Sequence, residues 1–372
     1  MTTADTKKKN KPNVSELFGK IFKRQIFIPI AAVLVLLLFN LIVDPGFFSI
    51  ELTRNSAGNP VLSGNLITIL NNGSELAILV LGMTLVTAAS GGQDISVGAT
   101  IAIAGSIILR IVCGTDAKAD SASFGIVLVA FLVACVASMA FGAFNGALVS
   151  IFKIQPMVAT LILFTAGRSI AAWINNNQLP TVSDPSFGYI GGFIPGIPIP
   201  TPFIITVICI VLMALLLKFT NLGLYSQAVG INESSSKLNG INPIFIKFLT
   251  FVILGLCTAV CGLIKVSRVS GITYSVIAQD IEMDAILAVA LGGNALGGGK
   301  FNMAASIIGA YIIQILTTTL YAYKIESTAL SAYKAIVVIV LVIVSAPAVR
   351  NKTKAFFAKL KAKAAAERKE VA

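Results

Sequence analysis

The sequence predicts an all-α, polytopic membrane protein of about ten transmembrane helices, some of them broken by glycine. Its mean hydropathy is +0.90. Of the 372 residues, 56% are hydrophobic and only 12% are charged, whereas soluble domains carry about 25% charged residues. Long apolar runs recur along the chain, and two of them stop at clusters of glycine. We therefore expect little room for a soluble domain.

The net charge of +12 suggests nucleic acid as a partner until the positions of the basic residues are considered. Seven Lys or Arg residues precede the first apolar run and eight follow the last, so fifteen of the 28 lie at the two ends. This positive-inside pattern predicts both termini in the cytoplasm and an even number of spans. The expected partner is a lipid bilayer, not nucleic acid. We expect residues 1–24 and 351–372 to be basic cytoplasmic segments around a transmembrane domain at 25–350.

The helices can be placed from the apolar runs, taken in order. The first, 26–43, ends in Asp44-Pro45-Gly46, not in a small-residue cleavage site, so we expect a span and not a signal peptide. The second, 65–89, contains polar residues 71–75, and the sequence leaves open whether these begin a separate surface helix. The other helices are expected from the first glycine pair to about 113, then at 125–149, 158–174, 202–217, 248–264, 283–291, 301–321 and 332–349. A re-entrant segment among these is the alternative to ten full spans.

The first glycine interruption follows the second helix, with the sequence Gly91-Gly92-Gln93-Asp94-Ile95-Ser96-Val97-Gly98. Asp94 is well placed to cap the next helix by accepting from the N–H groups near Ser96 and Val97. Irregular polar backbone at membrane depth survives only inside protein or beside a water-filled path. A tight turn between helices is the alternative. We expect the translocation pathway to be lined by Asn71, Asn72, Glu75, Gln93, Asp94, Ser96 and Asn145.

The second interruption contains Gly292, Gly293, Gly297 and Gly298, and we expect these, with Gly91, Gly92 and Gly98, to be structural breaks. It is not a phosphate-binding loop, because Asn294 stands at the first glycine position and Phe301 at the Ser/Thr position. The chain has no histidine, and its five cysteines form no Cys-x-x-Cys pair. We therefore expect no catalytic residues, no metal and no cofactor.

The longest loop expected in the cytoplasm, residues 218–245, carries signals for two short helices. Gly230 is expected to end the first, Asn232 to cap the second and Gly240 to terminate it. With Glu233 and Leu238, these residues would form a compact docking element. A solvated connector is the alternative.

Three motifs together resemble the inner-membrane permease subunit of sugar ABC importers, the ribose/galactose group related to branched-chain amino-acid permeases. They cover most of residues 65–315. The motifs are Gly82-Met83-Thr84 with Gly91 to Gly98, the loop from Ala228 to Asn242, and Asp284-Ala285-Ile286 with the late glycines. Within that group, residues 153–163 and 299–302 look most like galactofuranose permeases. Gln93 departs from the usual isoleucine, and Ser234 and Ser235 stand where alanines are common.

The resemblance implies a type II ABC-importer fold in a bacterial inner membrane. It implies a subunit that is not an enzyme and that moves a neutral monosaccharide, such as galactofuranose or a related galactose- or ribose-type sugar. The implied partners are cytoplasmic ATPase subunits, a second permease, identical or homologous, and a periplasmic or lipid-anchored sugar-binding protein.

Other functions remain open from the sequence. An ion-coupled secondary transporter would need a membrane-embedded ion site, for which Glu75, Asp94 and Asp284 are the acidic candidates. An ABC permease for a nucleoside or a branched-chain amino acid is a further alternative. A sugar phosphate is not expected as substrate, because the interior is predicted to hold no cluster of Arg or Lys.

Overall fold

The computed structural model describes residues 26–54, 60–326, 329–330, 332–337 and 339 of the chain. In this part, six helices are long and apolar enough to cross a membrane. They are α3 (Asn65–Ser90), α5 (Phe124–Ser150), α6 (Pro156–Ile174), α8 (Thr201–Phe219), α11 (Pro243–Val269) and α13 (Met303–Ala322). The predicted membrane class is therefore confirmed by the length and composition of the helices.

Within the described residues, three shorter helices pack with them: α2 (Phe27–Val43), α4 (Val97–Cys113) and α12 (Ile281–Leu291). With 11 residues, α12 is about 16 Å long, roughly half the thickness of a bilayer core. The expected tenth span, 332–349, lies largely outside the described residues, as do 1–24 and 351–372. The number of ten spans therefore stays a prediction.

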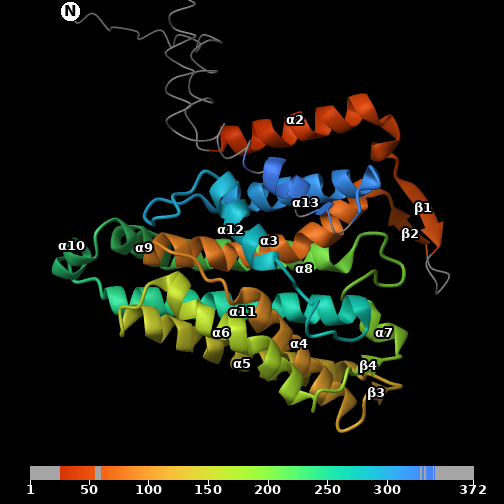
Figure 1. Ribbon diagram of the computed structural model, residues 1–372, viewed down its shortest axis with the longest axis horizontal. Helices are drawn as coiled ribbons and strands as arrows, with labels where there is room; N and C mark the ends of the chain where they lie inside the picture. The colour runs from red at the N-terminus through yellow and green to blue at the C-terminus, as the bar shows by residue number, and fades with distance from the viewer. Residues whose placement is uncertain (1–25, 55–59, 327–328, 331, 338, 340–372) are drawn as a thin grey trace, which may run out of the picture.

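α3 is the central helix of the bundle, with α13 and α2 on one side and α11, α5, α4 and α6 on the other (Figure 1). It runs unbroken through residues 71–75, so the polar stretch is not a separate surface helix. Nearly all of its apolar segment is buried by α8, α9, α11, α12 and α13. α3, which carries the polar residues 71–75 in its first half, is thus held inside the protein.

Small residues let α5 and α11 approach closely. A Cβ atom on Gly142 would lie 2.4 Å from the carbonyl oxygen of Phe251, and one on Gly255 would lie 2.3 Å from that of Ser138. Gly142 and Gly146, four residues apart on one face of α5, both meet α11. α5 and α8 turn their other faces outward, where large apolar side chains such as Val136 and Leu212 are exposed. These faces are suited to lipid.

The two ends of the bundle carry different elements. One end has the short helices α9 (Leu222–Ile231) and α10 (Glu233–Leu238). The other has the 3₁₀ helix η1 (Pro45–Phe48), helix α7 (Pro185–Gly188) and two small sheets, the antiparallel pair β1 (Glu51–Arg54) and β2 (Pro60–Ser63) and the parallel pair β3 (Lys118–Ala119) and β4 (Thr181–Val182). The chain is mostly helical, as predicted, and in these loops short strands tie distant segments together.

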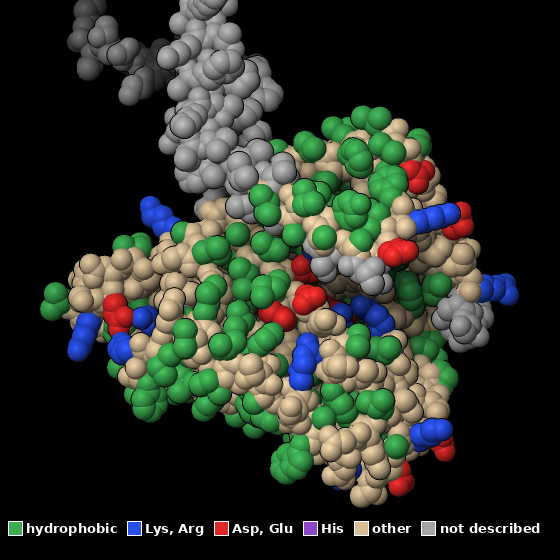
Figure 2. Space-filling model, in the orientation of Figure 1, with side chains coloured by type: hydrophobic (Ala, Val, Ile, Leu, Met, Phe, Trp, Pro, Cys, Tyr) green, Lys and Arg blue, Asp and Glu red, His purple; other side chains and the backbone are tan. Residues whose placement is uncertain are grey.

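The surface reflects the same organisation. Figure 2 shows apolar side chains over the visible face, a group of charged side chains at the end that holds α9 and α10, and a hollowed centre where acidic and basic side chains lie close together. Charge inside an apolar bundle is costly and marks a functional site.

Candidate functional site: a polar cavity and a glycine junction

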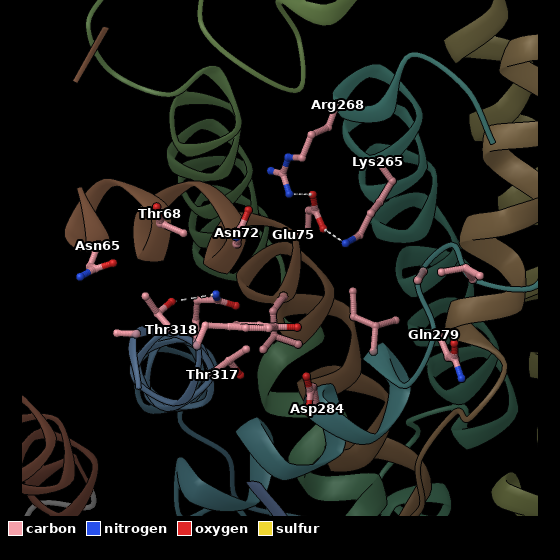
Figure 3. Close-up of a pocket in the computed structure, with 17 residues that line it drawn as sticks. Asn65, Thr68, Asn72, Glu75, Lys265, Arg268, Gln279, Asp284, Thr317 and Thr318 are labelled. Atoms are coloured by element: carbon pink, nitrogen blue, oxygen red, sulfur yellow. Dashed lines mark hydrogen bonds and ion pairs between the residues drawn. The ribbon is translucent and has the colours of Figure 1, made fainter. Parts of the chain in front are cut away.

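A cavity of about 650 Å³ lies between α3, α11, α12 and α13 (Figure 3). α3 supplies Asn65, Thr68, Asn72 and Glu75, at intervals of three or four residues that place them on one face of the helix. α13 faces them with Gln314, Thr317, Thr318 and Tyr321, which also share one helical face. The remaining polar and charged lining residues are Lys265, Arg268, Gln279 and Asp284.

Glu75 forms two ion pairs with α11 at this cavity. Its Oε2 lies 2.6 Å from Nζ of Lys265, and its Oε1 lies 2.7 Å from Nη1 of Arg268. Arg268 also donates from Nη2 to the backbone and side-chain oxygens of Asn71, at 3.1 and 3.0 Å. The expectation of an interior without a basic cluster was wrong. It failed because α11 continues to Val269, five residues beyond the predicted end of this helix, and so brings both cations into the bundle.

Asp284 is the second carboxylate of the cavity. Both of its oxygens accept from Nζ of Lys334, at 2.9 and 2.8 Å. Lys334 belongs to the segment expected to form the last span. Both carboxylates of the cavity are therefore ion-paired: Glu75 with Lys265 and Arg268, and Asp284 with Lys334.

Asp94 lies in a separate, buried network. Its Oδ1 accepts from the backbone N–H of Ser96 at 2.7 Å and from Oγ of Ser96 at 2.6 Å. Asn145 of α5 donates to Oδ2 of Asp94 at 3.2 Å and to Oγ of Ser96 at 2.9 Å. The predicted bond from the N–H of Ser96 is present. The capping role itself was wrong, because Ser96 is the N-cap residue of α4 and no side chain caps this helix. The network fixes the start of α4 against α5.

The predicted pathway residues thus fall into two groups. Asn72 and Glu75 line the cavity, and Asn71 orients Arg268. Gln93, Asp94, Ser96 and Asn145 do not line it, and their place in the translocation pathway stays a prediction. Gln93 instead donates to the carbonyl oxygen of Leu296 at 3.0 Å, which joins the first break to the second. These four side chains have hydrogen-bond partners within the protein.

The three sequence motifs meet at one place, here called the glycine junction and made of Ala88, Gly91, Gly230, Gly298 and Gly299. Gly91 ends α3 with a left-handed backbone, φ 68°. The N–H of Gly299 donates to the carbonyl oxygen of Ala88 at 2.9 Å. A Cβ atom on Gly298 would lie 2.9 Å from Cα of Gly91, and one on Gly230 would lie 1.8 Å from the oxygen of Ala88. Both breaks and α9 are in backbone contact here.

The other predicted break glycines have different roles. Gly92 packs against the ring of Pro156, and Gly293 has a left-handed backbone, φ 74°. Gly292 is in the right-handed helical region and packs on the backbone of α13. The structural role expected for Gly98 and Gly297 needs correction. Gly98 lies inside α4 against Glu282, so it is no break, and a Cβ on Gly297 would meet nothing within 4 Å.

The loop between α8 and α11 forms the predicted pair of short helices. Asn232 caps α10, since its side chain accepts from the N–H of Ser235 at 2.9 Å, and Gly240 follows α10 with φ 80°. The expected helix stop at Gly230 was wrong: α9 continues to Ile231, and glycine is needed there because α9 touches the end of α3. Leu238, at the end of α10, is 89% exposed.

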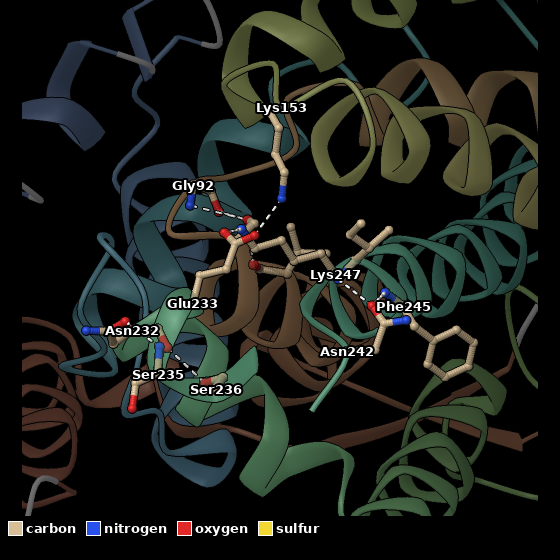
Figure 4. A network of polar contacts seen from close by, with 12 residues as sticks. Gly92, Lys153, Asn232, Glu233, Ser235, Ser236, Asn242, Phe245 and Lys247 are labelled. Carbon is tan, nitrogen blue, oxygen red and sulfur yellow. Dashed lines mark hydrogen bonds and ion pairs between the residues drawn. The ribbon is translucent and has the colours of Figure 1, made fainter. Parts of the chain in front are cut away.

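Glu233 holds α10 to two other elements (Figure 4). Its carboxylate lies 2.5 Å from Nζ of Lys153, in the loop before α6, and 2.6 Å from Nζ of Lys247 on α11. Hydrogen bonds from Lys153 and Lys247 hold the pKa of the Glu233 carboxyl below its usual range. Its partners are therefore within this chain.

Among the residues that the structure describes, no group of three His, Cys, Asp or Glu side chains could hold a metal ion. The site offers a polar cavity inside an apolar bundle and a close backbone junction next to the two short helices α9 and α10.

A bundle of apolar helices around a polar cavity is an architecture typical of membrane transport proteins. Residues 65–346 match the family described as branched-chain amino acid transport system / permease component, and the chain belongs to this family of ABC-transporter permeases.

Curated relatives of this chain are sugar permeases. The galactofuranose transporter permease of Escherichia coli K12 is 39% identical over 316 residues, which are 85% of this chain and 88% of the relative. The fructose import permease of Bifidobacterium longum NCC 2705 is 34% identical, over 92% of this chain and 94% of the relative. The ribose import permease of E. coli K12 is 33% identical, over 84% and 91%. No solved structure gave a significant match.

Proposed function

We propose that this chain is the transmembrane subunit of an ABC importer that moves a neutral monosaccharide into the cytoplasm. Galactofuranose, or a related galactose- or ribose-type sugar, is the proposed substrate. The observation that carries the proposal is the cavity between α3, α11 and α13, whose volume of about 650 Å³ falls within the range of small-molecule sites. The similarity to the galactofuranose permease supports the choice of sugar.

The cavity wall has the chemistry that a sugar requires. Asn72, Gln279 and Gln314 offer amide donors and acceptors, and Thr317 and Tyr321 offer hydroxyl groups. A sugar hydroxyl is both donor and acceptor, so such groups can replace its water. The charged residues are engaged in ion pairs, which leaves these neutral groups to contact the substrate.

The proposed coupling element is the pair α9 and α10, which would contact a cytoplasmic ATPase. Two observations support it: the exposed apolar side chain of Leu238, and the glycine junction, where α9 touches both glycine breaks. A displacement of α10 by the ATPase would be transmitted to α11 and to the loop before α6 through the ion pairs of Glu233.

The finer topology is part of this proposal. Ten spans of the type II importer fold would be completed by the segment from about 332, with both basic termini in the cytoplasm beside α9 and α10. The proposed assembly pairs this permease with an identical or homologous one, two ATPase subunits, and a periplasmic or lipid-anchored binding protein. Fifteen of the 28 Lys and Arg residues lie at the two ends of the chain, which supports this orientation.

Uptake by vesicles that contain the whole importer tests the proposal. Labelled galactofuranose should accumulate only with ATP present, should be insensitive to a protonophore at constant ATP, and should be competed by excess unlabelled furanose. If ribose or a branched-chain amino acid competes and the furanose does not, the proposed substrate is wrong. Uptake driven by an ion gradient without ATP would overturn the ABC mechanism itself.

A further inference from the structure

The cavity proposed for an uncharged sugar contains a lysine and an arginine. Lys265 and Arg268 occupy positions i and i+3 on α11, and both side chains reach towards Glu75 (Figure 3). Such a pair is a common binding site for phosphates and carboxylates. If the substrate is uncharged, a further group in the cavity must therefore prevent these two cations from binding anions.

Glu75 lies behind the two cations. Its side chain is only 2% exposed, whereas those of Lys265 and Arg268 are 28% and 25% exposed. The cations face the cavity, and the carboxylate neutralises them from the protein side. A ligand in the cavity meets mainly the two cations, because Glu75 lines the cavity with only a small exposed part of its side chain.

The second carboxylate cannot replace Glu75. Both oxygens of Asp284 accept from Lys334, so its charge is already compensated. The other contacts of Arg268 are to oxygens of Asn71 and Gly191, which are dipoles and carry no net charge. Within the described residues, Glu75 is the carboxylate paired with Lys265 and Arg268.

We propose that Glu75 determines the charge specificity of the cavity: by neutralising Lys265 and Arg268 it admits uncharged sugars and prevents the binding of anionic ones, such as sugar phosphates and uronates. This inference rests on the proposed function, because it treats the cavity as the sugar's path. Without Glu75, the same wall becomes an anion site of unchanged shape.

The test places a reporter thiol in the cavity. Thr317→Cys projects from α13 towards the cavity, and its modification rate is compared for a negatively charged and a positively charged methanethiosulfonate reagent on the purified permease. The parent chain is the control, since four of its five cysteines are buried and the fifth is partly so. The ratio of the two rates reports the electrostatic potential at residue 317.

In the Thr317→Cys background, Glu75→Gln should shift this ratio about tenfold towards the negative reagent, and Lys265→Gln should shift it the opposite way. The double variant Glu75→Gln/Lys265→Gln should return it towards the parent value. If Glu75→Gln does not fold, Lys265→Gln decides, because Glu75 still pairs with Arg268 in that protein. A ratio unchanged in every variant that folds overturns the proposal.

Protection by ligand completes the test. Galacturonate should slow modification of Thr317→Cys in the Glu75→Gln protein but not in the parent, whereas galactose should protect only the parent or both equally. Galacturonate protection of both proteins alike overturns the proposal. The proposed function has its own readout: if a bulky neutral reagent at Thr317→Cys leaves sugar uptake intact, the path is elsewhere, even where the charge shift is observed.

Discussion

The cavity and the glycine junction are built in opposite ways, although α3 contributes to both. At the cavity, polar and charged side chains from α3, α11 and α13 face a space of about 650 Å³. At the junction, Gly91, Gly230 and Gly298 bring three backbones together with no room for a Cβ atom. The first region is defined by chemical groups and the second by their absence.

This difference separates the tasks of the two regions. Side chains in an open cavity can be exchanged to change what binds, as long as the charges remain paired. A junction made of backbone transmits a displacement without taking up the movement in side-chain rotamers. We infer that substitutions in the cavity change specificity, whereas substitutions at the junction change coupling.

The largest effect is expected for Gly230→Val. Its Cβ would lie 1.8 Å from the oxygen of Ala88 and 2.6 Å from the nitrogen of Gly299, both backbone atoms. We expect a loss of about 3 kcal/mol or more in stability, together with loss of ATP-dependent uptake. Because the end of α3 is displaced, the variant is not confined to a surface loop.

The matched control is Gly223→Ala in the same helix. There a Cβ would approach only side-chain atoms, Cδ2 of Leu217 at 3.3 Å and Cζ of Phe301 at 3.7 Å. Thermal unfolding and vesicle uptake are measured for both variants. If uptake in Gly230→Val stays coupled to ATP hydrolysis as in the parent, α9 is a plain connector and not a coupling element.

The second largest loss of stability is expected for Glu75→Ala. It leaves Lys265 and Arg268 without their carboxylate, and breaking a buried ion pair costs about 3 kcal/mol when the partners remain charged. Glu75→Ala/Lys265→Ala should recover part of this loss. The free energy of unfolding of the purified permease decides, and equal loss in the single and double variants would mean that the pair is not the cause.

Asp94→Ala should destabilise the chain by about 2 kcal/mol, because Ser96 and Asn145 lose a buried acceptor. Asp94→Asn should retain most of the function, since an amide oxygen still accepts from Ser96 and the Asn145 amide can turn to accept from the new amide. Uptake and assembly are measured for both. Complete loss of uptake in a stable, assembled Asp94→Asn importer would show that the charge itself is required.

The smallest effect is expected at Glu233. Its folded-state pKa is lowered, so its ion pairs contribute stability above the usual pKa of glutamate, and that contribution is lost as the pH falls through the folded pKa. The side chain is 37% exposed, so solvent screens the pairs and about 0.5 kcal/mol is expected. The stability difference between the parent and Glu233→Gln, followed from pH 7 downwards, should shrink. A difference that grows on acidification would contradict the pairing.

The sequence predicted the helices well where apolar runs alone determine them. Expected and observed ends of α2, α5 and α6 agree within two residues. The end of α11 was missed because Lys265 and Arg268 look like interfacial anchors when no partner is visible. Their partner, Glu75, is about 190 residues away in the chain, and a single sequence does not reveal such a pairing.

Only part of the site could be predicted, again because a single sequence does not reveal which distant residues pair. The spacing of Thr68, Asn72 and Glu75 marks one polar face of α3, and that of Gln314, Thr317 and Tyr321 marks the facing side of α13, a signal the sequence contains. Asp94 and Asn145 look equally polar, but their partners are each other and Ser96. Polarity at membrane depth identifies a special residue without showing whether it contacts water or protein.

The central claim, that sugar passes through the cavity between α3, α11 and α13, is tested most directly by blocking it. Thr317→Cys in the cavity and Val211→Cys on the exposed face of α8 are each treated with a bulky neutral thiol reagent in importer vesicles. We predict that ATP-dependent sugar uptake falls at least about tenfold in the first, that saturating sugar slows the modification, and that the second is unaffected. Full uptake after complete modification of Thr317→Cys would contradict the account.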